Sequence, residues 1–409
     1  MHKKDKIFKG KTLAILSGGG DTPAINSSIE NVCRRAMLLG FRVYGIRKGW
    51  KGLLGEGDVV DLTRLPYNGA YGGTALKSSR TNPFPTAKNP EDRVPQIMAN
   101  LKRYHIDALV TIGGDDTNGA AKRLYEREGI PVIGFPKTID NDLRTKTMHH
   151  YNGQDIEAVL CPGFPSGALY ISDFVRHLRS TNESHERIMV VEVMGRDAGW
   201  LTGASVFGGA EMALVPEVEM TAERKERFFE EVKKRYSEKK NLIIAVSEGV
   251  RWWNDETKEL GMVYASSETD EYGHKRFGGV SGVVASEINK RLGVEARAQI
   301  SGYYPRSGVC SGYDRRFTSA LADKVMDLLL REEYGQMPVL RQMVTADYLE
   351  EYNISSVDMG SIGNQPLQQI YYNESNFTFT DAYVDFLKHI LGDPYLPTFG
   401  CEFPKVNPA

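Results

Sequence analysis

The sequence predicts an α/β fold built around parallel sheets, and two observations carry this prediction. First, residues 12–16 (TLAIL) and 108–112 (ALVTI) are short apolar runs of the kind that a parallel sheet buries on both faces. Second, each run is followed by a glycine-bearing loop, SGGGDT or GGDD, and then by a stretch with helical character. A strand, loop and helix that recur in this order predict neighbouring parallel strands.

The helices of these two units have recognisable ends. The first helix is expected over residues 23–39, because Thr22 can cap its start and Gly40 stands just beyond its end. The second helix follows GGDD, runs to about Glu128 and leads into a strand at residues 131–135 (PVIGF). Both glycine loops are therefore expected between a buried strand and a helix N-terminus.

Two further apolar runs, residues 188–193 (IMVVEV) and 242–246 (LIIAV), lead into MGRDAG and SEG. Because active-site groups of open parallel sheets gather just beyond the strand ends, these segments are candidates for a binding site. Residues 217–240 are rich in Glu, Lys and Arg and predict an amphipathic helix with one solvated face. Its apolar residues are Phe228, Phe229, Val232 and Tyr236.

Length and composition narrow the class of protein. A chain of 409 residues exceeds the usual size of a single core, so two domains are expected. Lys plus Arg (51) nearly balance Asp plus Glu (53), which argues against a nucleic-acid surface or a polybasic membrane anchor. We expect a cytoplasmic protein, because the basic start lacks an apolar signal segment and no apolar run is long enough to span a membrane. Four widely spaced cysteines are expected as buried free thiols: Cys33, Cys161, Cys310 and Cys401.

The first glycine loop has the features of an anion site. Gly18, Gly19 and Gly20 let backbone amides approach a phosphate closely, and the following helix N-terminus adds its positive end. Tight packing at a strand-to-helix turn remains an alternative reading, and neither GxGxxG nor GxxxxGK[ST] is present. In the segment GGTALKSSR, Lys77 and Arg80 can hold phosphate, although a plain surface loop would also carry such charges.

Carboxylates follow two of the predicted strands, in GGDD and in FPKTIDND. Asp115 and Asp142 offer hard oxygen ligands for Mg²⁺, directly or through water. Asp140 is a possible general base that accepts the proton of an attacking alcohol. Turn-forming and capping roles explain any one of these acids but not the set, so the pattern predicts phosphoryl transfer.

The ordered motifs SGGGDTPAIN, GGTALKSSR, GGDD, PKTIDND, SHERIMVVEVMGRDAG, SEG and EARAQISGYYPRSG resemble the phosphofructokinase family over residues 12–316. Within that family, the chain looks most like the pyrophosphate-dependent enzymes. The resemblance implies two facing Rossmann-like doubly wound domains with the active site in the cleft between them. The donor domain would comprise residues 1–151 and about 305–355, and the sugar-phosphate domain residues 152–304 and about 356–400.

The resemblance also implies roles for individual residues. Asp140 would be the catalytic base, with Lys137 and Thr138 beside it, and Asp115 and Asp142 would hold Mg²⁺. The donor would be bound by Gly18, Gly19, Gly20, Lys77, Arg80 and Asp116. The sugar phosphate would be bound by Thr138, Asp140, Arg187, Met194, Gly195, Arg196, Glu248, Arg297, Tyr303 and Arg306, of which Arg187 reaches a neighbouring subunit's site in this family. Tyr303 departs from the family pattern, which usually has histidine there.

Two residues indicate which donor is used. Asp116 stands where nucleotide-using relatives typically have glycine, so its carboxylate would occupy and repel the space of the α-phosphate of ATP. Lys137 stands where those relatives commonly have glycine and would add positive charge for the transferring or leaving phosphate. Some ATP-using relatives combine PKTIDND with GGDG, so Lys137 alone does not distinguish the two donors. Asp116 is the residue that favours pyrophosphate.

The resemblance therefore implies reversible, Mg²⁺-dependent transfer of phosphate from pyrophosphate to the 1-hydroxyl of fructose 6-phosphate, in a homodimer or homotetramer. The alternatives are an ATP-dependent 6-phosphofructokinase and a pyrophosphate-dependent kinase that also accepts sedoheptulose 7-phosphate. Kinases of NAD or lipids share the metal loop but not MGRDAG or the arginines of the last motif. A catalytically silent sensor would be expected to have lost Asp115, Asp140 or Asp142, all of which are present.

Overall fold

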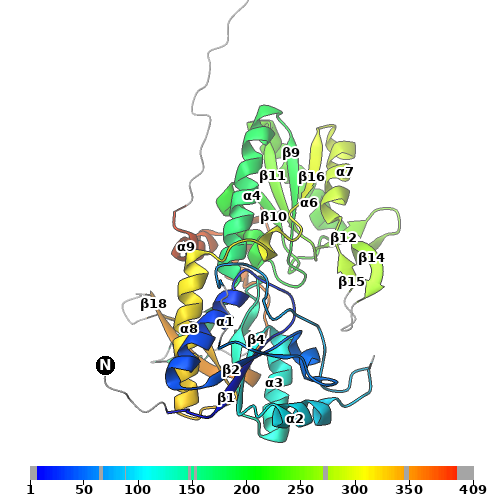
Figure 1. Ribbon diagram of the computed structural model, residues 1–409. Coiled ribbons are helices and arrows are strands. Elements are labelled where there is room, and N and C mark those ends of the chain that lie inside the picture. Colours follow the sequence, from blue (N-terminus) through cyan, green and yellow to red (C-terminus); the bar gives the residue numbers. More distant parts are fainter. Residues whose placement is uncertain are drawn as a thin grey trace, which may run out of the picture.

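The computed structural model describes residues 7–63, 68–87, 89–145, 149–151, 154–269, 275–344 and 350–393. Its N-terminal sheet has the strand order β3-β2-β1-β4-β5 (Figure 1). The pairs β2–β1, β1–β4 and β4–β5 are parallel, whereas β3 runs antiparallel to β2 at the edge. The strands are β1 (Thr12–Ser17), β2 (Arg42–Ile46), β3 (Val59–Asp61), β4 (Ala108–Gly113) and β5 (Val132–Pro136).

Helices cover both faces of this sheet (Figure 1). Alternate β1 side chains divide between the faces: Leu13 and Ile15 pack with α1 and α8, whereas Ala14 and Leu16 pack with α2 and α3. This arrangement makes the sheet doubly wound, as the sequence predicts. The helices are α1 (Ile25–Leu39), α2 (Val94–Arg103), α3 (Asp115–Glu128) and α8 (Gly312–Leu330).

The C-terminal sheet has the order β10-β11-β9-β16, and all of its strand pairs are parallel. The helix α4 packs on one face, and α6 and α7 pack on the other. Its strands are β9 (Ile188–Val193), β10 (Met212–Leu214), β11 (Leu242–Ser247) and β16 (Ala296–Ile300). Its helices are α4 (Phe164–Ser184), α5 (Trp200–Gly203), α6 (Ala222–Lys239) and α7 (Val280–Leu292).

A third sheet has the order β18-β17-β8-β7 and takes strands from distant parts of the chain, β7 (His149–Tyr151), β8 (Gln154–Leu160), β17 (Gln336–Val344) and β18 (Glu350–Asp358). The remaining pairs are β6 (Leu143–Thr145) with β19 (Ile362–Asn364), β12 (Arg251–Asn254) with β13 (Glu259–Met262), β14 (Tyr264–Thr269) with β15 (Lys275–Phe277), and β20 (Tyr372–Asn373) with β21 (Thr378–Phe379). The chain's last described helix is α9 (Asp381–Leu391). The predicted domain boundaries remain a prediction.

Two helices begin later than the sequence pattern predicts. The helix α1 starts at Ile25, because Ala24 is its N-cap and the Thr22 hydroxyl accepts from the Ala24 amide at 3.3 Å instead of capping the helix. The helix α6 starts at Ala222, where the Thr221 hydroxyl accepts from the Arg224 amide, and not at residue 217. The predicted end of α1 is confirmed, since Gly40 adopts the left-handed conformation at φ 101°.

A buried carboxylate joins the two halves of the molecule. Asp314 of α8 is fully buried and accepts hydrogen bonds from the amides of Gly163 (3.0 Å) and Ser166 (2.9 Å) at the start of α4. The Ser166 hydroxyl donates a third hydrogen bond at 2.5 Å. Burial raises the pKa of Asp314 to about 6, although these donors favour its charged form. These hydrogen bonds connect α8, which packs on the N-terminal sheet, to the first turn of α4.

Among the described residues, no helix is both long and apolar enough to cross a membrane. Cys33, Cys161 and Cys310 are buried free thiols, as predicted, whereas Cys401 lies outside the described residues.

Candidate active site

The first glycine loop is held close to the start of α3. A side chain at Gly18 would lie 2.5 Å from the Thr117 hydroxyl oxygen, so glycine is required for this approach. The Gly18 amide donates to the Ile112 carbonyl at 3.0 Å, which joins the ends of β1 and β4. Gly19 adopts φ 77°, a conformation that favours glycine. Packing therefore explains Gly18 in part, and the loop also lies at a helix N-terminus suited to anions.

The segment that carries Lys77 and Arg80 lies against the same loop. The Gly19 amide donates to the Ser79 carbonyl at 3.2 Å, and the Ser78 hydroxyl donates to the Gly19 carbonyl. Both cationic side chains are exposed on this segment. Lys77 has φ 61°, a left-handed conformation that is uncommon outside glycine. The structure thus brings the two predicted donor-binding cations to the edge of the glycine loop.

Asp115 and Asp116 occupy the first turn of α3, and both are exposed there. A helix N-terminus favours negative charge, so these acids are stable at this position whatever else they do. The neighbouring residues Thr117 and Asn118 are buried, and Asn118 donates to the Gly113 carbonyl at 2.6 Å. This contact fixes the turn that presents both carboxylates beside the glycine loop.

The segment after β5 carries the predicted catalytic residues. Lys137 is buried, and its ammonium group donates to the carbonyls of Gly18 (3.0 Å) and Gly20 (2.5 Å). Burial, together with the nearby charge of Arg306, lowers the pKa of Lys137 to about 7, although the acidic neighbours Asp21 and Asp140 act in the opposite direction. Lys137 therefore holds the glycine loop as well as carrying charge toward it.

Asp140 and Asp142 lie together beside Lys137. The Thr138 hydroxyl accepts from the Asp140 amide at 3.0 Å and donates to the Asp142 carboxylate at 3.1 Å. Burial raises the pKa of Asp140, whereas Arg306 and Arg196 act in the opposite direction. Burial raises the pKa of Asp142 to about 7, and the charge of Asp140 contributes. Paired carboxylates with raised pKa values are typical of acid–base and metal-binding sites.

The loops that follow β9 and β11 carry the predicted sugar-binding segments MGR and SEG. The Glu248 amide donates to the Val193 carbonyl at 2.9 Å, and the Gly249 amide donates to the Gly195 carbonyl at 3.2 Å. Burial, with a contribution from Asp140, raises the pKa of the Glu248 carboxyl to about 7. These hydrogen bonds join the two loops. The Glu248 carboxylate interacts electrostatically with Asp140, the predicted base.

Arg306 joins the two halves of the site. Its Nη1 donates to the Asp21 carbonyl at 3.1 Å, and its Nε lies 3.2 Å from the Met194 sulfur. Gly20 leaves the space that the Arg306 guanidinium fills. Arg196 pairs with Asp197 at 2.6 Å. Arg306 is therefore placed between the donor loop and the MGR segment, where an anionic sugar can reach it.

Two predicted sugar-binding residues, Arg187 and Arg297, are not gathered with the others. Arg297 pairs in register with Met189, five residues before Met194, which places it about 16 Å along the sheet from the MGR segment. Arg187 precedes β9 at the same end, and both arginines lie near Glu295, at 4.0 Å for Arg187 and 2.7 Å for Arg297. Tyr303 is 66% exposed, and its contacts give it no defined role.

Two residues that position the site were missed by the sequence interpretation. Asn141 is buried at φ 51°, donates to the Val159 carbonyl (3.1 Å) and accepts from the Cys161 amide (3.0 Å). Gly163, at φ 103°, packs against Thr22 and the Thr138 carbonyl. Asn141 lies inside the TIDND motif, so its tolerance of the left-handed region was the available signal. Gly163 had no such signal.

The donor set fits Mg²⁺ bound together with substrate phosphates. Among the described residues, no group of three or more His, Cys, Asp or Glu side chains could hold a metal by itself. Mg²⁺ usually binds through one or two carboxylates, substrate phosphates and water, so such a group is not needed. Asp140 and Asp142 lie close together, and the negative charge of Asp140 makes ionisation of Asp142 less favourable. A bound cation would stabilise both carboxylates in their charged form.

Two doubly wound sheets whose strand ends bring together glycine loops, carboxylates and arginines define a phosphoryl-transfer enzyme of the α/β class. The chain belongs to the phosphofructokinase family, since residues 12–329 match the model of that family, described as Phosphofructokinase.

Relatives in this family are named for either donor. The pyrophosphate–fructose 6-phosphate 1-phosphotransferase of Dictyoglomus thermophilum is 38% identical over 329 residues, 79% of this chain and 87% of the relative. The ATP-dependent 6-phosphofructokinase 3 of Streptomyces coelicolor is 34% identical over 338 residues, 80% of this chain and 90% of the relative. The structure of the pyrophosphate-dependent phosphofructokinase from Nitrosospira multiformis has a TM-score of 0.75 at 22% identity and covers 96% of this chain and 95% of its own. This similarity confirms the predicted fold.

Proposed function

We propose that the protein is a Mg²⁺-dependent pyrophosphate–fructose 6-phosphate 1-phosphotransferase, which runs in both directions. The observation that carries this proposal is the position of Asp140. Its charge interacts with Lys137, which holds the glycine loop, and with Arg196, Glu248 and Arg306 on the other side. A base between a phosphate-binding loop and a sugar-binding loop is what transfer to an alcohol requires. The relatives' pyrophosphate-dependent names support the same reaction.

In the forward direction the sugar's 1-hydroxyl attacks the near phosphorus of pyrophosphate and gives its proton to the Asp140 carboxylate. A new bond joins the sugar oxygen to that phosphorus, and the bond from phosphorus to the bridging oxygen breaks, releasing phosphate. Lys137, Lys77 and Arg80 would balance charge on the transferring and leaving groups. Bound Mg²⁺, held by Asp115 and Asp142, would withdraw charge from the phosphate oxygens.

Pyrophosphate is the preferred donor because of Asp116. This carboxylate is exposed at the first turn of α3, directly beside Asp115. We infer that a donor longer than two phosphates would have to pass it. Repulsion of a third phosphate group would exclude ATP without affecting pyrophosphate. The decisive measurement is the initial rate of fructose 1,6-bisphosphate formation with pyrophosphate or ATP as the only donor. Activity with ATP alone would overturn the donor assignment.

Asp116→Gly sharpens that test. We expect the variant to gain measurable activity with ATP and to keep its rate with pyrophosphate within about tenfold, since one repulsive carboxylate is removed and no transition-state contact is lost. Asp323→Asn, which changes an acid of α8 outside the candidate site, is the control. If ATP affinity in Asp116→Gly were unchanged, exclusion by charge would be wrong.

We also propose that the working enzyme is a homodimer or homotetramer in which Arg187 and Arg297 bind the sugar phosphate of a neighbouring subunit. Both arginines lie at the end of the C-terminal sheet remote from their own chain's MGR segment. A guanidinium pair at that distance cannot bind the same sugar as Arg306, so a second copy is the natural recipient. Cytoplasmic location and activity with sedoheptulose 7-phosphate remain predictions; comparing rates with the two sugars would decide the latter.

A further inference from the structure

The chain returns to the candidate site after the third sheet. The strand β19 pairs antiparallel with β6, which directly follows the TIDND segment. Just beyond β19, the Gln365 amide donates to the Asp142 carbonyl at 2.7 Å. The chain is therefore attached, at Gln365, to the segment that carries the predicted base.

Two residues further on, the chain is attached to the predicted sugar-binding side. The Leu367 amide donates to the Glu217 carboxylate at 2.7 Å, and the same oxygen accepts from the Gly199 amide at 2.9 Å. Gly199 is the last residue of MGRDAG and the N-cap of α5. A Cβ atom on residue 199 would lie 2.6 Å from Val215 and 3.0 Å from the second oxygen of Glu217, so glycine is required there. Glu217 thus holds Leu367 against the end of the MGRDAG segment.

The link between these two attachment points is short and stiff. Only Pro366 separates Gln365 from Leu367, and two residues span at most about 7 Å. The proline ring fixes φ and has no amide hydrogen, so the two neighbouring residues supply both hydrogen bonds. Pro366 itself is exposed. We call residues 365–367 (Gln-Pro-Leu) the connector.

The helix α5, which follows MGRDAG, receives contacts from β6 and from α9. Its first residue, Trp200, is fully buried. The guanidinium of Arg144 in β6 lies 4.6 Å from the Trp200 ring, and the Tyr383 hydroxyl of α9 donates to the Trp200 carbonyl. The Tyr383 ring also occupies the space that a side chain at Gly203 would need. The start of α5 is therefore a fixed point to which the MGRDAG segment is attached.

The two segments that the connector joins carry groups that must meet in the reaction. Asp140 lies two residues before Asp142, and Arg196 lies three residues before Gly199. The charge of Arg196 favours the ionised form of Asp140. A displacement of about 1 Å between reacting groups can lower a rate by roughly 100-fold. The length of the connector should therefore matter for the rate.

We propose that the connector sets the separation between the base-bearing TIDND segment and the sugar-binding MGRDAG segment, with Glu217 as the positioning residue that joins it to the second segment. This role rests on the proposed function, which assigns Asp140 and Arg196 to one transfer reaction. The connector lies beyond residues 12–329, which match the family. It acts through the backbone of the two segments.

Lengthening the connector tests its role directly. One glycine inserted after Pro366 adds up to about 3.5 Å and keeps every donor and acceptor of the two attachment points. We expect kcat per fructose 6-phosphate site to fall by roughly 100-fold, while the dissociation constant of this sugar changes by less than about threefold. One glycine inserted after Thr257, in the exposed turn between β12 and β13, is the matched control.

Substitutions of Glu217 keep the connector at its length and test the joint. Glu217→Leu removes the oxygen that Gly199 and Leu367 share, so we expect kcat per site to fall by about tenfold. Glu217→Gln keeps an oxygen for both amides, so its kcat per site should stay within about threefold of the wild type.

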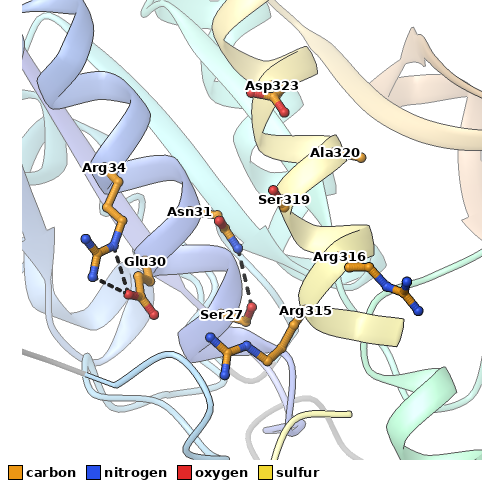
Figure 2. A pocket seen from close by; sticks show the side chains of 9 residues that line it. All are labelled: Ser27, Glu30, Asn31, Arg34, Arg315, Arg316, Ser319, Ala320 and Asp323. Atoms are coloured by element: carbon orange, nitrogen blue, oxygen red, sulfur yellow. Dashed lines mark hydrogen bonds and ion pairs between the residues drawn. The ribbon is translucent and has the colours of Figure 1, made fainter. Parts of the chain in front are cut away.

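Two acids serve as controls for these substitutions. Glu219→Leu removes a carboxylate of the same loop that pairs with Arg251. Asp323→Asn changes an acid of α8, which Figure 2 shows among the side chains that line a pocket between α1 and α8. Neither variant should change kcat per site.

Isothermal titration with fructose 6-phosphate counts the sugar sites, and steady-state rates with pyrophosphate and Mg²⁺ then give kcat per counted site. A merely structural role would lower the number of sites and leave kcat per site unchanged. That result, or a change confined to the dissociation constant, in both the insertion and Glu217→Leu would overturn the positioning role alone. A wild type inactive with pyrophosphate and fructose 6-phosphate would overturn the proposed function, and the role of the connector with it.

Discussion

The two sheets contribute to the candidate site in different ways. The residues predicted to bind the donor all lie beyond β1, β4 or β5, or on the segment held against Gly19. The predicted sugar-binding residues on the C-terminal sheet divide between its two ends: Met194 and Glu248 lie beyond the carboxyl ends, whereas Arg187 and Arg297 lie at the amino ends. One chain thus assembles the donor half, and we infer that the sugar half requires a neighbour.

The base at the junction of the two halves should give the largest effect. We expect Asp140→Asn to lower kcat by about 10³-fold, because a positioned general base contributes roughly 10²- to 10⁴-fold. The KM for fructose 6-phosphate should change by less than about threefold, since the arginines are untouched. Steady-state kinetics with pyrophosphate checks this, with Asp197→Asn as a control for loss of a nearby carboxylate. A nearly normal kcat would remove Asp140 as the base.

Mixing subunits tests the comparison directly. Arg187→Ala and Arg297→Ala should each lower kcat/KM for fructose 6-phosphate by about 100-fold, because each removes a charged contact to phosphate. If the arginines act in a neighbour, random hybrids of Asp140→Asn and Arg187→Ala dimers regain about a quarter of wild-type activity, because half of the dimers then hold one intact site. Activity measured after mixing and refolding would decide. Hybrids no more active than their parents would place Arg187 in its own chain's site or in a structural role.

We expect the stability of the protein to depend on pH because of Lys137, which lies in the donor half of the site. Its pKa is lowered by burial to about 7, so between pH 7 and 10.5 the unfolded state binds more protons than the folded state. The free energy of unfolding should therefore rise with pH across this window, by up to about 1.4 kcal/mol per pH unit relative to Lys137→Met. Urea unfolding of both proteins at several pH values measures the difference. A constant difference would show that Lys137 has its ordinary pKa in the fold.

The sequence predicted five strands of the two parallel sheets closely, because a buried parallel strand is a short apolar run with a polar end. The strand β9 has the predicted bounds, and β4 and β11 differ by one residue at the end. The start of α6 was wrong because Glu217 is not helical: its carboxylate accepts from the amides of Gly199 and Leu367. Such a contact links residues that are far apart in the chain and leaves no periodic signal.

The same limit applies to the candidate site. Motif order placed Asp140 and Asp142 with the glycine loop, and the structure brings these segments together. It could not indicate that Arg306 fills the space beside Gly20 while Arg297, nine residues earlier, lies at the other end of a strand. Direction along a strand decides which end a residue reaches, and residue type alone carries no such information.

The hydrogen bonds of the Asp314 carboxylate decide whether either half of the protein can fold as a separate fragment. A single apolar cluster includes residues of β1, α8, α4 and β9, and Asp314 closes it by holding the first turn of α4. A fragment that ends before α8 would leave those amides without an acceptor in an apolar setting, at a cost of several kcal/mol. Neither half should therefore be obtained as a folded fragment, and the chain should behave as one cooperative unit although its architecture contains two sheets.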